Sequence, residues 1–434
     1  MGKEVNQQNR ASNNVHVANF SEIPTLSGHH KDHKTGRKKR AIVNGNTGPV
    51  APLSNLLSDI LKPYCNELKD TIGKTVENTE ELLRDFVEYN KSSKCDNGGK
   101  KFIGSLDVES LYPSLKVSDC VDIVRETIIN SDINIDTVDI KELSIFLRKS
   151  FSTKQLIQIG VNDFIPTKVK APKNVKSVDK DQSKTNVTHA LWKFPESQPS
   201  KHIKKTMWAE AIVYGVQLIM QNHVYKFDNQ IKVQKDGGSI GVTLTGVLSE
   251  IKMLKWCHKF RNTCDNIGIQ IDLEDRFVDD ITLILEETKP GLKLISGQLV
   301  HCEDKFKEDI EIKADKRTMD IVQLVANQID ENIKVTYDVP SNYSDGYVPI
   351  LDVKVSINCD KNIDYIFYKK PMASRNVTHK KSAMSVSQKY IKRTQQTFTG
   401  TNPVKIASQN GYCHGISFST KKKNKERKTE KRKK

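Results

Sequence analysis

The pattern of apolar and polar positions predicts helices and strands in alternation along most of the chain. Leucine and isoleucine recur at helical spacing in the stretch that Pro63 is expected to end. The predicted helices cover residues 50–62, 75–89, 121–130, 138–149, 207–221 and 292–306. Runs of β-formers predict a strand that begins at Phe102, a strand pair at 223–233, and strands at 332–337, 348–357 and 365–369. This mixture predicts an α+β fold.

Two neighbouring carboxylates lie inside a strong strand pattern. Phe277 and Val278 precede Asp279 and Asp280, and apolar β-formers follow, which predicts a strand, a tight turn and a second strand. Because successive side chains of a strand point to opposite faces, both carboxylates can serve one site only where the hairpin bends. Two anions so close together repel in a poorly solvated pocket, and a divalent cation relieves that repulsion. Taken alone, the pair also fits a solvated turn.

A third carboxylate, Asp107, ends the apolar run that starts at Phe102. A carboxylate at a strand end can hold a metal ion, and the neighbouring backbone carbonyl of Val108 can supply another oxygen ligand. Tyr112 is placed to lie under a bound sugar. A buried strand that stops at the turn of Pro113 explains the same residues without a site.

A glycine-rich loop separates these carboxylates along the chain. Gln234 is followed by Gly237, Gly238 and Gly241, and three glycines within five positions let the backbone approach a ligand closely. The helix expected after the loop would present free N–H groups to that ligand. The spacing matches neither the P-loop nor the dinucleotide-binding fingerprint.

Positive charge is concentrated at the two ends of the chain. The 434 residues carry a net charge of +16, and residues 421–434 hold ten Lys and Arg against two Glu. Residues 1–40 hold eight Lys and Arg against three acidic residues, and they include a basic loop in which Lys34 and Arg40 would bind a triphosphate or a phosphate backbone. A nuclear-import signal or an exposed hairpin fits that loop as well. The two basic ends favour a polyanionic partner, although the tail also fits a segment that only aids solubility.

The remaining composition indicates an intracellular protein. The eight cysteines show no C-x-x-C spacing, so neither a zinc site nor a disulfide framework is expected. No apolar run reaches 18 residues, so no membrane partner is expected. The basic clusters favour the nucleus, with the cytoplasm as the alternative.

In their order along the chain, these stretches resemble the motifs of reverse transcriptases. Motifs A, B and C are matched by Asp107 with Tyr112, by Gln234-x-x-Gly237-x-x-x-Gly241, and by Phe277-Val278-Asp279-Asp280. The run from Lys31 to Val43 resembles a fingers pattern of the same family. The segments Val348–Val353 and Tyr368–Pro371 are similar to segments of Penelope-like retroelement enzymes. The resemblance covers about residues 27–395.

The resemblance implies a right-hand polymerase with fingers, a palm and a short thumb. The palm would be a ferredoxin-like antiparallel sheet with helices on one face. The implied parts are a disordered N-terminus at 1–20, fingers at 21–100 and 116–230 with a flexible insertion at 167–190, palm at 101–115 and 231–360, a thumb or connection at 361–420, and a basic tail at 421–434.

The implied activity is that of an RNA-directed DNA polymerase from a retroelement, with an RNA or DNA template, a primer and deoxynucleoside triphosphates as partners. Asp107, Asp279 and Asp280 would be catalytic, and with the carbonyl of Val108 they would bind two Mg²⁺ ions, Mn²⁺ being the alternative. The implied nucleotide-binding residues are Lys34, Arg40, Tyr112 and Gln234. The implied template-primer contacts are Gly237, Gly238, Gly241, Lys369 and Lys370. The oligomeric state is left open.

Departures from the family pattern keep other classes open. Ser239-Ile240 follow the glycine pair where the family has a small or proline residue and methionine, and Ala41 stands where proline is usual. A decayed or domesticated relic that only binds nucleic acid is therefore one alternative. A family-B DNA polymerase and a viral RNA-dependent RNA polymerase are others, and Val278 and Tyr112 disfavour the viral enzyme.

Overall fold

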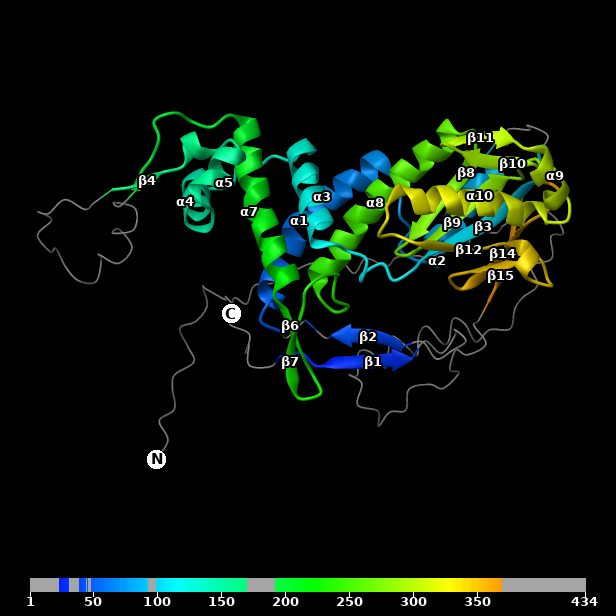
Figure 1. The fold of residues 1–434 in the computed structure, drawn as a ribbon, viewed down its shortest axis with the longest axis horizontal. Helices are drawn as coiled ribbons and strands as arrows, with labels where there is room; N and C mark the ends of the chain where they lie inside the picture. Colours follow the sequence, from blue (N-terminus) through cyan, green and yellow to red (C-terminus); the bar gives the residue numbers. More distant parts are fainter. Residues whose placement is uncertain are drawn as a thin grey trace, which may run out of the picture. The chain divides into compact units, whose positions relative to one another are not determined.

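The computed structural model describes residues 23–30, 39–43, 45, 48–92, 99–169 and 192–368, all within the first of the two units, Met1–Met372, into which the chain divides (Figure 1). The helices are α1 Ala51–Ile72, α2 Thr79–Lys91, α3 Val117–Asn130, α4 Ile140–Ser150, α5 Thr153–Gln158, η2 Asn162–Phe164, α7 Lys201–Gln221, α8 Thr243–Asn266, α9 Glu303–Asp309, α10 Ala314–Ile329 and η3 Pro340–Asn342. The strands are β1 Leu26–His30, β2 Lys39–Val43, β3 Lys101–Val108, β4 Thr167–Lys168, β5 Trp192–Lys193, β6 His223–Phe227, β7 Gln230–Gln234, β8 Ile271–Phe277, β9 Asp280–Glu286, β10 Leu292–Ile295, β11 Gln298–His301, β12 Val335–Asp338, β13 Val348–Ile350, β14 Val353–Ile357 and β15 Ile363–Phe367.

Four strands form a central antiparallel sheet in the order β12-β3-β9-β8. Along the chain, helices lie between β3 and β8 and between β9 and β12, so the elements follow the β-α-β-β-α-β order of ferredoxin-like folds. The strand that comes first in sequence, β3, lies inside the sheet between the last strand and the third. The strand order agrees with the ferredoxin-like sheet that the resemblance implies, but helices do not keep to one face, because α8 and α10 pack on one face and α2 on the other.

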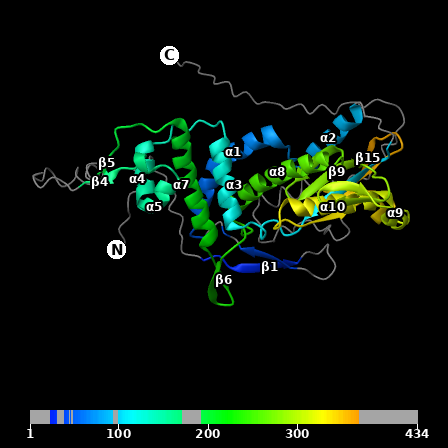
Figure 2. The ribbon, with the colours of Figure 1, turned by 45° about the horizontal axis from the view of Figure 1, so that its top comes forward.

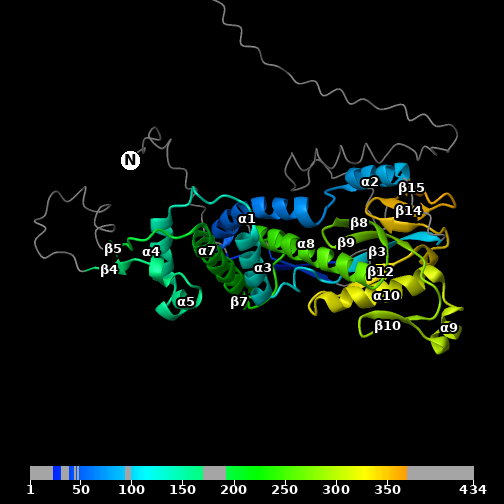
Figure 3. The same ribbon diagram turned by 90° about the horizontal axis from the view of Figure 1, so that it is seen from above.

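The alternation of side chains gives the central sheet two different faces. Leu106 and Ile281 point to one face and pack with residues of α8 and α10 in a buried apolar cluster. Ile103 and Ile284 point to the other face and pack with α2, β13 and β14 in a second cluster. Figure 3 shows the sheet between α10 on one side and α2 with β14 and β15 on the other.

The long helices α1, α3, α7 and α8 pack around a third cluster next to the sheet. Helix α1 packs against α8, and α3 packs against α7, around a third apolar cluster that includes Leu61, Val124 and Leu248. The β6–β7 hairpin connects α7 to the loop before α8 and lies beside β1 (Figures 1 and 2). The N–H of Lys226 in β6 donates to the carbonyl of Pro24 at 2.8 Å, which ties this hairpin to the segment before β1.

The prediction that Pro63 ends the first helix is wrong. Helix α1 continues to Ile72, and Pro63 lies on its exposed side. A proline inside a helix removes one hydrogen bond and costs about 3 kcal/mol. Beyond Pro63, α1 buries Tyr64 and Cys65 against α7 and α8, and this burial offsets the cost.

The prediction of a helix at 292–306 is also wrong. These residues form the β10–β11 hairpin, and α9 begins only at Glu303. The hairpin turns at Ser296 and Gly297, which have φ angles of 50° and 79°. A Ser-Gly pair between two short alternating runs is a hairpin signal, and it outweighs helical spacing over so few residues.

Several predicted segments lie outside the described residues. They include the N-terminus at 1–20, most of the insertion at 167–190, and everything after residue 368, so only the β15 part of the predicted thumb or connection is described. The ends of the insertion meet, because β4 pairs with β5. No helix in the described ranges is long and apolar enough to cross a membrane.

Candidate active site

Asp107 and Asp280 are direct cross-strand partners in the central sheet. The pairing of β3 with β9 places Asp107 opposite Asp280, and partners in this relation have side chains on the same face. That face is the one opposite α8 and α10, and both residues are half-buried. Residues 107 and 280 are therefore brought together by strand pairing across the sheet.

Asp279 joins this pair through its backbone. It occupies the two-residue turn between β8 and β9, and its carbonyl accepts a hydrogen bond of 3.1 Å from the N–H of Val108. The predicted residues Asp107, Val108, Asp279 and Asp280 thus meet at one end of the sheet. The carbonyl of Val108 as a metal ligand stays a prediction.

The turn that carries Asp279 has an unusual conformation at Val278. Its φ is 56°, in the left-handed region that β-branched residues rarely adopt. The carbonyl of Val278 accepts a hydrogen bond of 2.9 Å from Nη1 of Arg276, whose side chain is 2% exposed. Sequence analysis did not single out Arg276. The sequence shows only a charged residue inside a predicted strand, and the burial of its partner, Ile281, appears in the structure alone.

Backbone hydrogen bonds connect the predicted glycine loop to two other segments. The N–H of Gly238 donates to the carbonyl of Tyr112 at 2.7 Å, and the N–H of Val43 in β2 donates to the carbonyl of Ile240 at 3.2 Å. The segment after β3, the glycine loop and the β1–β2 hairpin are therefore neighbours, as their shared assignment to one site requires.

The first two glycines of this loop are required by close packing. Gly237 has a φ of 80°, and a Cβ there would lie 2.9 Å from the carbonyl oxygen of Pro113. A Cβ on Gly238 would lie 2.3 Å from Cγ2 of Thr245. Any side chain would push the loop away from the segment after β3 or from α8.

Hydrogen bonds in and beside the loop bear on two of its residues. The amide Nε2 of Gln234 donates to the carbonyls of Asp236 and Gly237, at 3.1 and 3.0 Å, so this donor shapes the loop itself. The N-terminus of α8 was expected to present free N–H groups to a ligand, but the N–H of Leu244 donates to Oγ of Ser54 at 3.0 Å. That expectation is wrong for Leu244, which is buried under α1.

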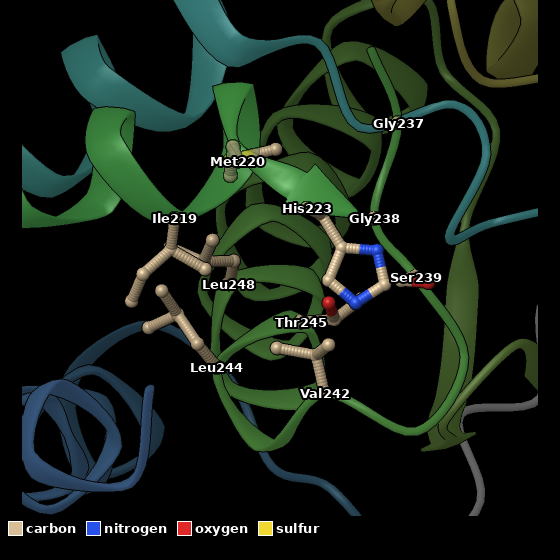
Figure 4. A pocket seen from close by; sticks show the side chains of 10 residues that line it. All are labelled: Ile219, Met220, His223, Gly237, Gly238, Ser239, Val242, Leu244, Thr245 and Leu248. Atoms are coloured by element: carbon tan, nitrogen blue, oxygen red, sulfur yellow. The ribbon is translucent and has the colours of Figure 1, made fainter. Parts of the chain in front are cut away.

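A small cavity of about 10 Å³ lies beneath the glycine loop (Figure 4). His223 is 4% exposed, its Nδ1 has no hydrogen-bond partner among the described residues, and burial lowers its pKa. Figure 4 shows the imidazole close to Ser239 and Thr245. The cavity is about the size that one water molecule needs.

Further charged residues lie near the carboxylate pair on the same face of the sheet. Asp275 is opposite Thr282 and therefore shares the face of Asp280. It is 3% exposed, and burial together with the neighbouring carboxylate of Asp85 raises the pKa of Asp275 to about 7. Lys74 pairs with Asp85 from the loop before α2. Asp275 and Asp85 are thus buried carboxylates, whereas the side chain of Lys74 is 57% exposed.

The structure describes only some of the other predicted site residues. Tyr112 is half-buried and packs against the apolar cluster of the central sheet. The backbone of Arg40 pairs with His29 in the β1–β2 hairpin, while its side chain lies outside what the structure describes. Lys34, Lys369 and Lys370 lie outside the described residues.

The donor set suits a hard cation. Within the described ranges, no group of three or more His, Cys, Asp and Glu side chains is placed to hold a metal ion. Mg²⁺, however, commonly takes one or two carboxylates and completes its shell with water and substrate phosphates. Asp107 and Asp280 fit that requirement, because their cross-strand pairing places two carboxylates on one face at the end of the sheet.

Comparisons with known proteins add weak structural likenesses. No protein-family model and no curated protein matches the chain. A telomerase from Candida albicans, solved with a fragment of telomeric RNA, is similar at 11% identity and a TM-score of 0.44, over 88% of this chain and 50% of that one. An apo telomerase from Candida tropicalis is similar at 12% identity and a TM-score of 0.40, over 86% of this chain and 52% of that one.

A viral enzyme is similar at a lower level. The BmCPV RNA-dependent RNA polymerase at its elongation state is 10% identical with a TM-score of 0.37, over 77% of this chain and 21% of that one. The chain therefore spans about half the length of the telomerases and about a fifth of the viral polymerase. Likenesses at these identities and TM-scores do not assign a fold or an activity by themselves, so the assignment has to come from the geometry of the site.

Proposed function

We propose that this chain is a template-directed nucleotidyltransferase, an RNA-directed DNA polymerase of a Penelope-like retroelement. The observation that carries the proposal is the direct pairing of Asp107 with Asp280 on a β-α-β-β-α-β sheet, beside a turn that holds Asp279. In this proposal the central sheet is the palm, the helices around α3 and α7 with the β1–β2 hairpin belong to the fingers, and β15 leads into the thumb or connection.

The carboxylates of Asp107 and Asp280, with Asp279 and the carbonyl of Val108, would hold Mg²⁺. When bound, such ions lower the pKa of a primer 3′-hydroxyl and stabilise negative charge on the transferred phosphates. Mn²⁺ has the same preference for oxygen donors and is expected to substitute. The half-buried position of the two opposed aspartates keeps bulk water partly away and strengthens their interaction with cations.

The surrounding segments would bind and orient the substrates. The backbone of Gly237 and Gly238 lies against the segment of Tyr112 and would form part of the wall for the base pair being formed. The ring of Tyr112 would occupy the space of a 2′-hydroxyl and select deoxynucleotides. Lys34 and Arg40 would contact the triphosphate, and Lys369 and Lys370 the template and primer.

The test is primer extension on an RNA template with a DNA primer, deoxynucleotides and Mg²⁺. We expect Asp107→Asn to reduce extension by a factor of about a thousand, because the neutral amide is a poor ligand for a hard cation. Asp228→Asn is the matched control, since Asp228 lies in the exposed turn of another hairpin and is expected to leave extension unchanged. Retained extension by Asp107→Asn contradicts the proposal.

Sugar selection tests the assignment of Tyr112. Tyr112→Ala is expected to raise ribonucleotide incorporation relative to deoxynucleotide incorporation. Tyr112→Phe serves as its control, because the ring that fills the space is kept. Equal selectivity in the wild type and the alanine variant contradicts this role.

A second candidate function is nucleic-acid binding without catalysis. The concentration of positive charge at residues 1–40 and 421–434 favours it, because phosphate neutralisation alone supports binding of any sequence. A gel-shift measurement with the same template and primer separates the two functions. A wild-type chain that binds the duplex and never extends it supports the second.

A further inference from the structure

Arg276 is a buried cation next to the turn of the candidate site. It is 2% exposed, and its Nη1 donates to the carbonyl of Val278 at 2.9 Å. Among the described residues, its Nε and Nη2 make no hydrogen bond. The guanidinium therefore directs its hydrogen bonding to one backbone carbonyl, that of the residue just before Asp279.

The position of Arg276 is fixed by elements outside the turn. Its Nη2 lies 2.9 Å from Oε1 of Glu250 on α8, an ion pair without the alignment of a hydrogen bond. Glu250 is also 3.4 Å from Nζ of Lys69 on α1. The backbone carbonyl of Arg276 accepts from the N–H of Val76 at 2.9 Å. The helices α1 and α8 and the loop before α2 thus hold Arg276 in place.

Val278 needs such a fixed partner. Its φ of 56° is unfavourable for a β-branched residue and persists only where surrounding contacts impose it. The peptide that Arg276 holds leads directly into Asp279, whose carbonyl bonds to the N–H of Val108. A change in this peptide plane would shift the turn relative to β3.

We propose that Arg276 is a positioning residue, which holds the Val278–Asp279 peptide so that Asp280 stays opposite Asp107. The catalytic consequence rests on the function proposed above. The structural consequence, a fixed bond between the turn and Val108, does not depend on that function.

The same helix and strand supply a matched control for this role. Arg261 on α8 lies 3.1 Å from the buried Glu274 on β8, two residues before Arg276. Removing either arginine takes a partner from a glutamate on one of these two elements and weakens their contact; the side chain of Glu274 is 4% exposed, and that of Glu250 is 21% exposed. Only Arg276 reaches the turn, so a purely structural role predicts similar effects for both.

The experiment compares Arg276→Met, Arg276→Lys and Arg261→Met in the full chain by hydrogen exchange, thermal unfolding and primer extension at varied Mg²⁺. For Arg276→Met we expect faster exchange of the Val108 amide, a raised Mg²⁺ requirement, and extension lowered about a hundredfold. Arg276→Lys keeps a charge and a donor and is expected to recover part of the loss. Arg261→Met is expected to unfold at lower temperature, with Val108 exchange and Mg²⁺ requirement unchanged.

A second variant separates the effect on the turn from a general loss of stability in Arg276→Met. Glycine adopts positive φ freely, so Val278→Gly combined with Arg276→Met is expected to restore slow Val108 exchange. Equal Val108 exchange in Arg276→Met and the wild type overturns the positioning role. A wild-type chain that never extends a primer refutes the proposed function, and the exchange of Val108 still decides the role of Arg276.

Discussion

Two hairpins of this chain make tight turns with different chemistry. The β6–β7 hairpin turns at Asp228 and Asn229, with φ angles of 49° and 56°, and these residue types enter the left-handed region at little cost. The β8–β9 hairpin turns at Val278 and Asp279, and there a β-branched residue has the positive φ. The first turn follows from local sequence preference. The second does not.

The surroundings of the two hairpins explain this difference. Ile231 in β7 is 63% exposed, whereas Ile281 in β9 is fully buried, and Arg276 holds the carbonyl of Val278. Tertiary contacts can therefore impose on β8–β9 a turn that β6–β7 has to encode locally. Such imposed strain is frequent where a side chain has to be aimed at a site.

We expect the two hairpins to differ most in primer extension when one aspartate of each is replaced by asparagine. Asp280→Asn should reduce primer extension by orders of magnitude and raise the free energy of unfolding by up to about 1 kcal/mol, because it removes the repulsion from Asp107. Asp228→Asn should change neither quantity appreciably. Urea unfolding and primer extension of both variants measure this, and equal effects at the two positions would remove the functional distinction.

The next largest effect is the pH dependence of stability, which we expect to come from β8. Because the pKa of Asp275 is raised to about 7 by burial and by Asp85, the folded chain keeps a proton that the unfolded chain releases near pH 4. The stability that protonated Asp275 contributes is therefore present at low pH and is lost as pH rises from about 4 to 7.

Urea unfolding between pH 4 and pH 8 measures this contribution. Asp275→Asn should flatten the decline of stability with rising pH across that window. The same experiment on Asp228→Asn should give the wild-type curve. A wild-type chain with no such decline would show that Asp275 is ionised in the folded state.

A smaller effect is expected from placing valine in the exposed turn. Asn229→Val should lower the free energy of unfolding by about 1–2 kcal/mol, because valine disfavours positive φ and the buried arginines of the described residues, Arg276 and Arg317, lie on other elements. Asn229→Gly is the control and should be close to neutral. Thermal unfolding reports both, and a valine variant as stable as the wild type would mean that this turn tolerates any residue.

The smallest effect is the reciprocal change in the buried turn. Val278→Gly should raise the free energy of unfolding by about 1 kcal/mol, since glycine adopts a φ of 56° without strain. The gain is limited because glycine also increases the entropy of the unfolded chain. A loss of stability would indicate that the packing of the Val278 side chain, which is 40% exposed, contributes more free energy than the strain of its backbone costs.

Sequence reasoning predicted the strands and the turn that carry the carboxylates, because strand patterns and turn residues are local signals. The predicted hairpin around Asp279 and the strand that ends near Asp107 are both present. The sequence alone could not show that α1 continues through Pro63, because the burial of Tyr64 that offsets the cost of the proline involves helices far along the chain. For β10–β11, the turn signal of Ser296 and Gly297 was present and was outweighed by an apparent helical spacing.

Roles that depend on partners were the hardest to predict. The amide of Gln234 hydrogen-bonds within its own loop, which the sequence did not indicate, and its contact with a nucleotide stays a prediction. Arg276 was not singled out, because nothing in the sequence pairs it with Glu250 or with the carbonyl of Val278. Such contacts depend on side chains that meet only after the sheet and α8 are packed.

The inside position of β3 has a consequence for how the chain folds. Its residues Phe102, Ile103, Leu106 and Val108 are at most 5% exposed in the folded protein, yet both neighbouring strands are encoded far downstream. Asp107 pairs with Asp280, 173 residues later (280 minus 107), and with Thr336 in β12. Pairings this distant in sequence slow folding and leave apolar strands exposed during synthesis. The carboxylates of the candidate site can thus meet only after β8 and β9 have been synthesised, and a chaperone that covers β3 until then would raise the yield of folded protein.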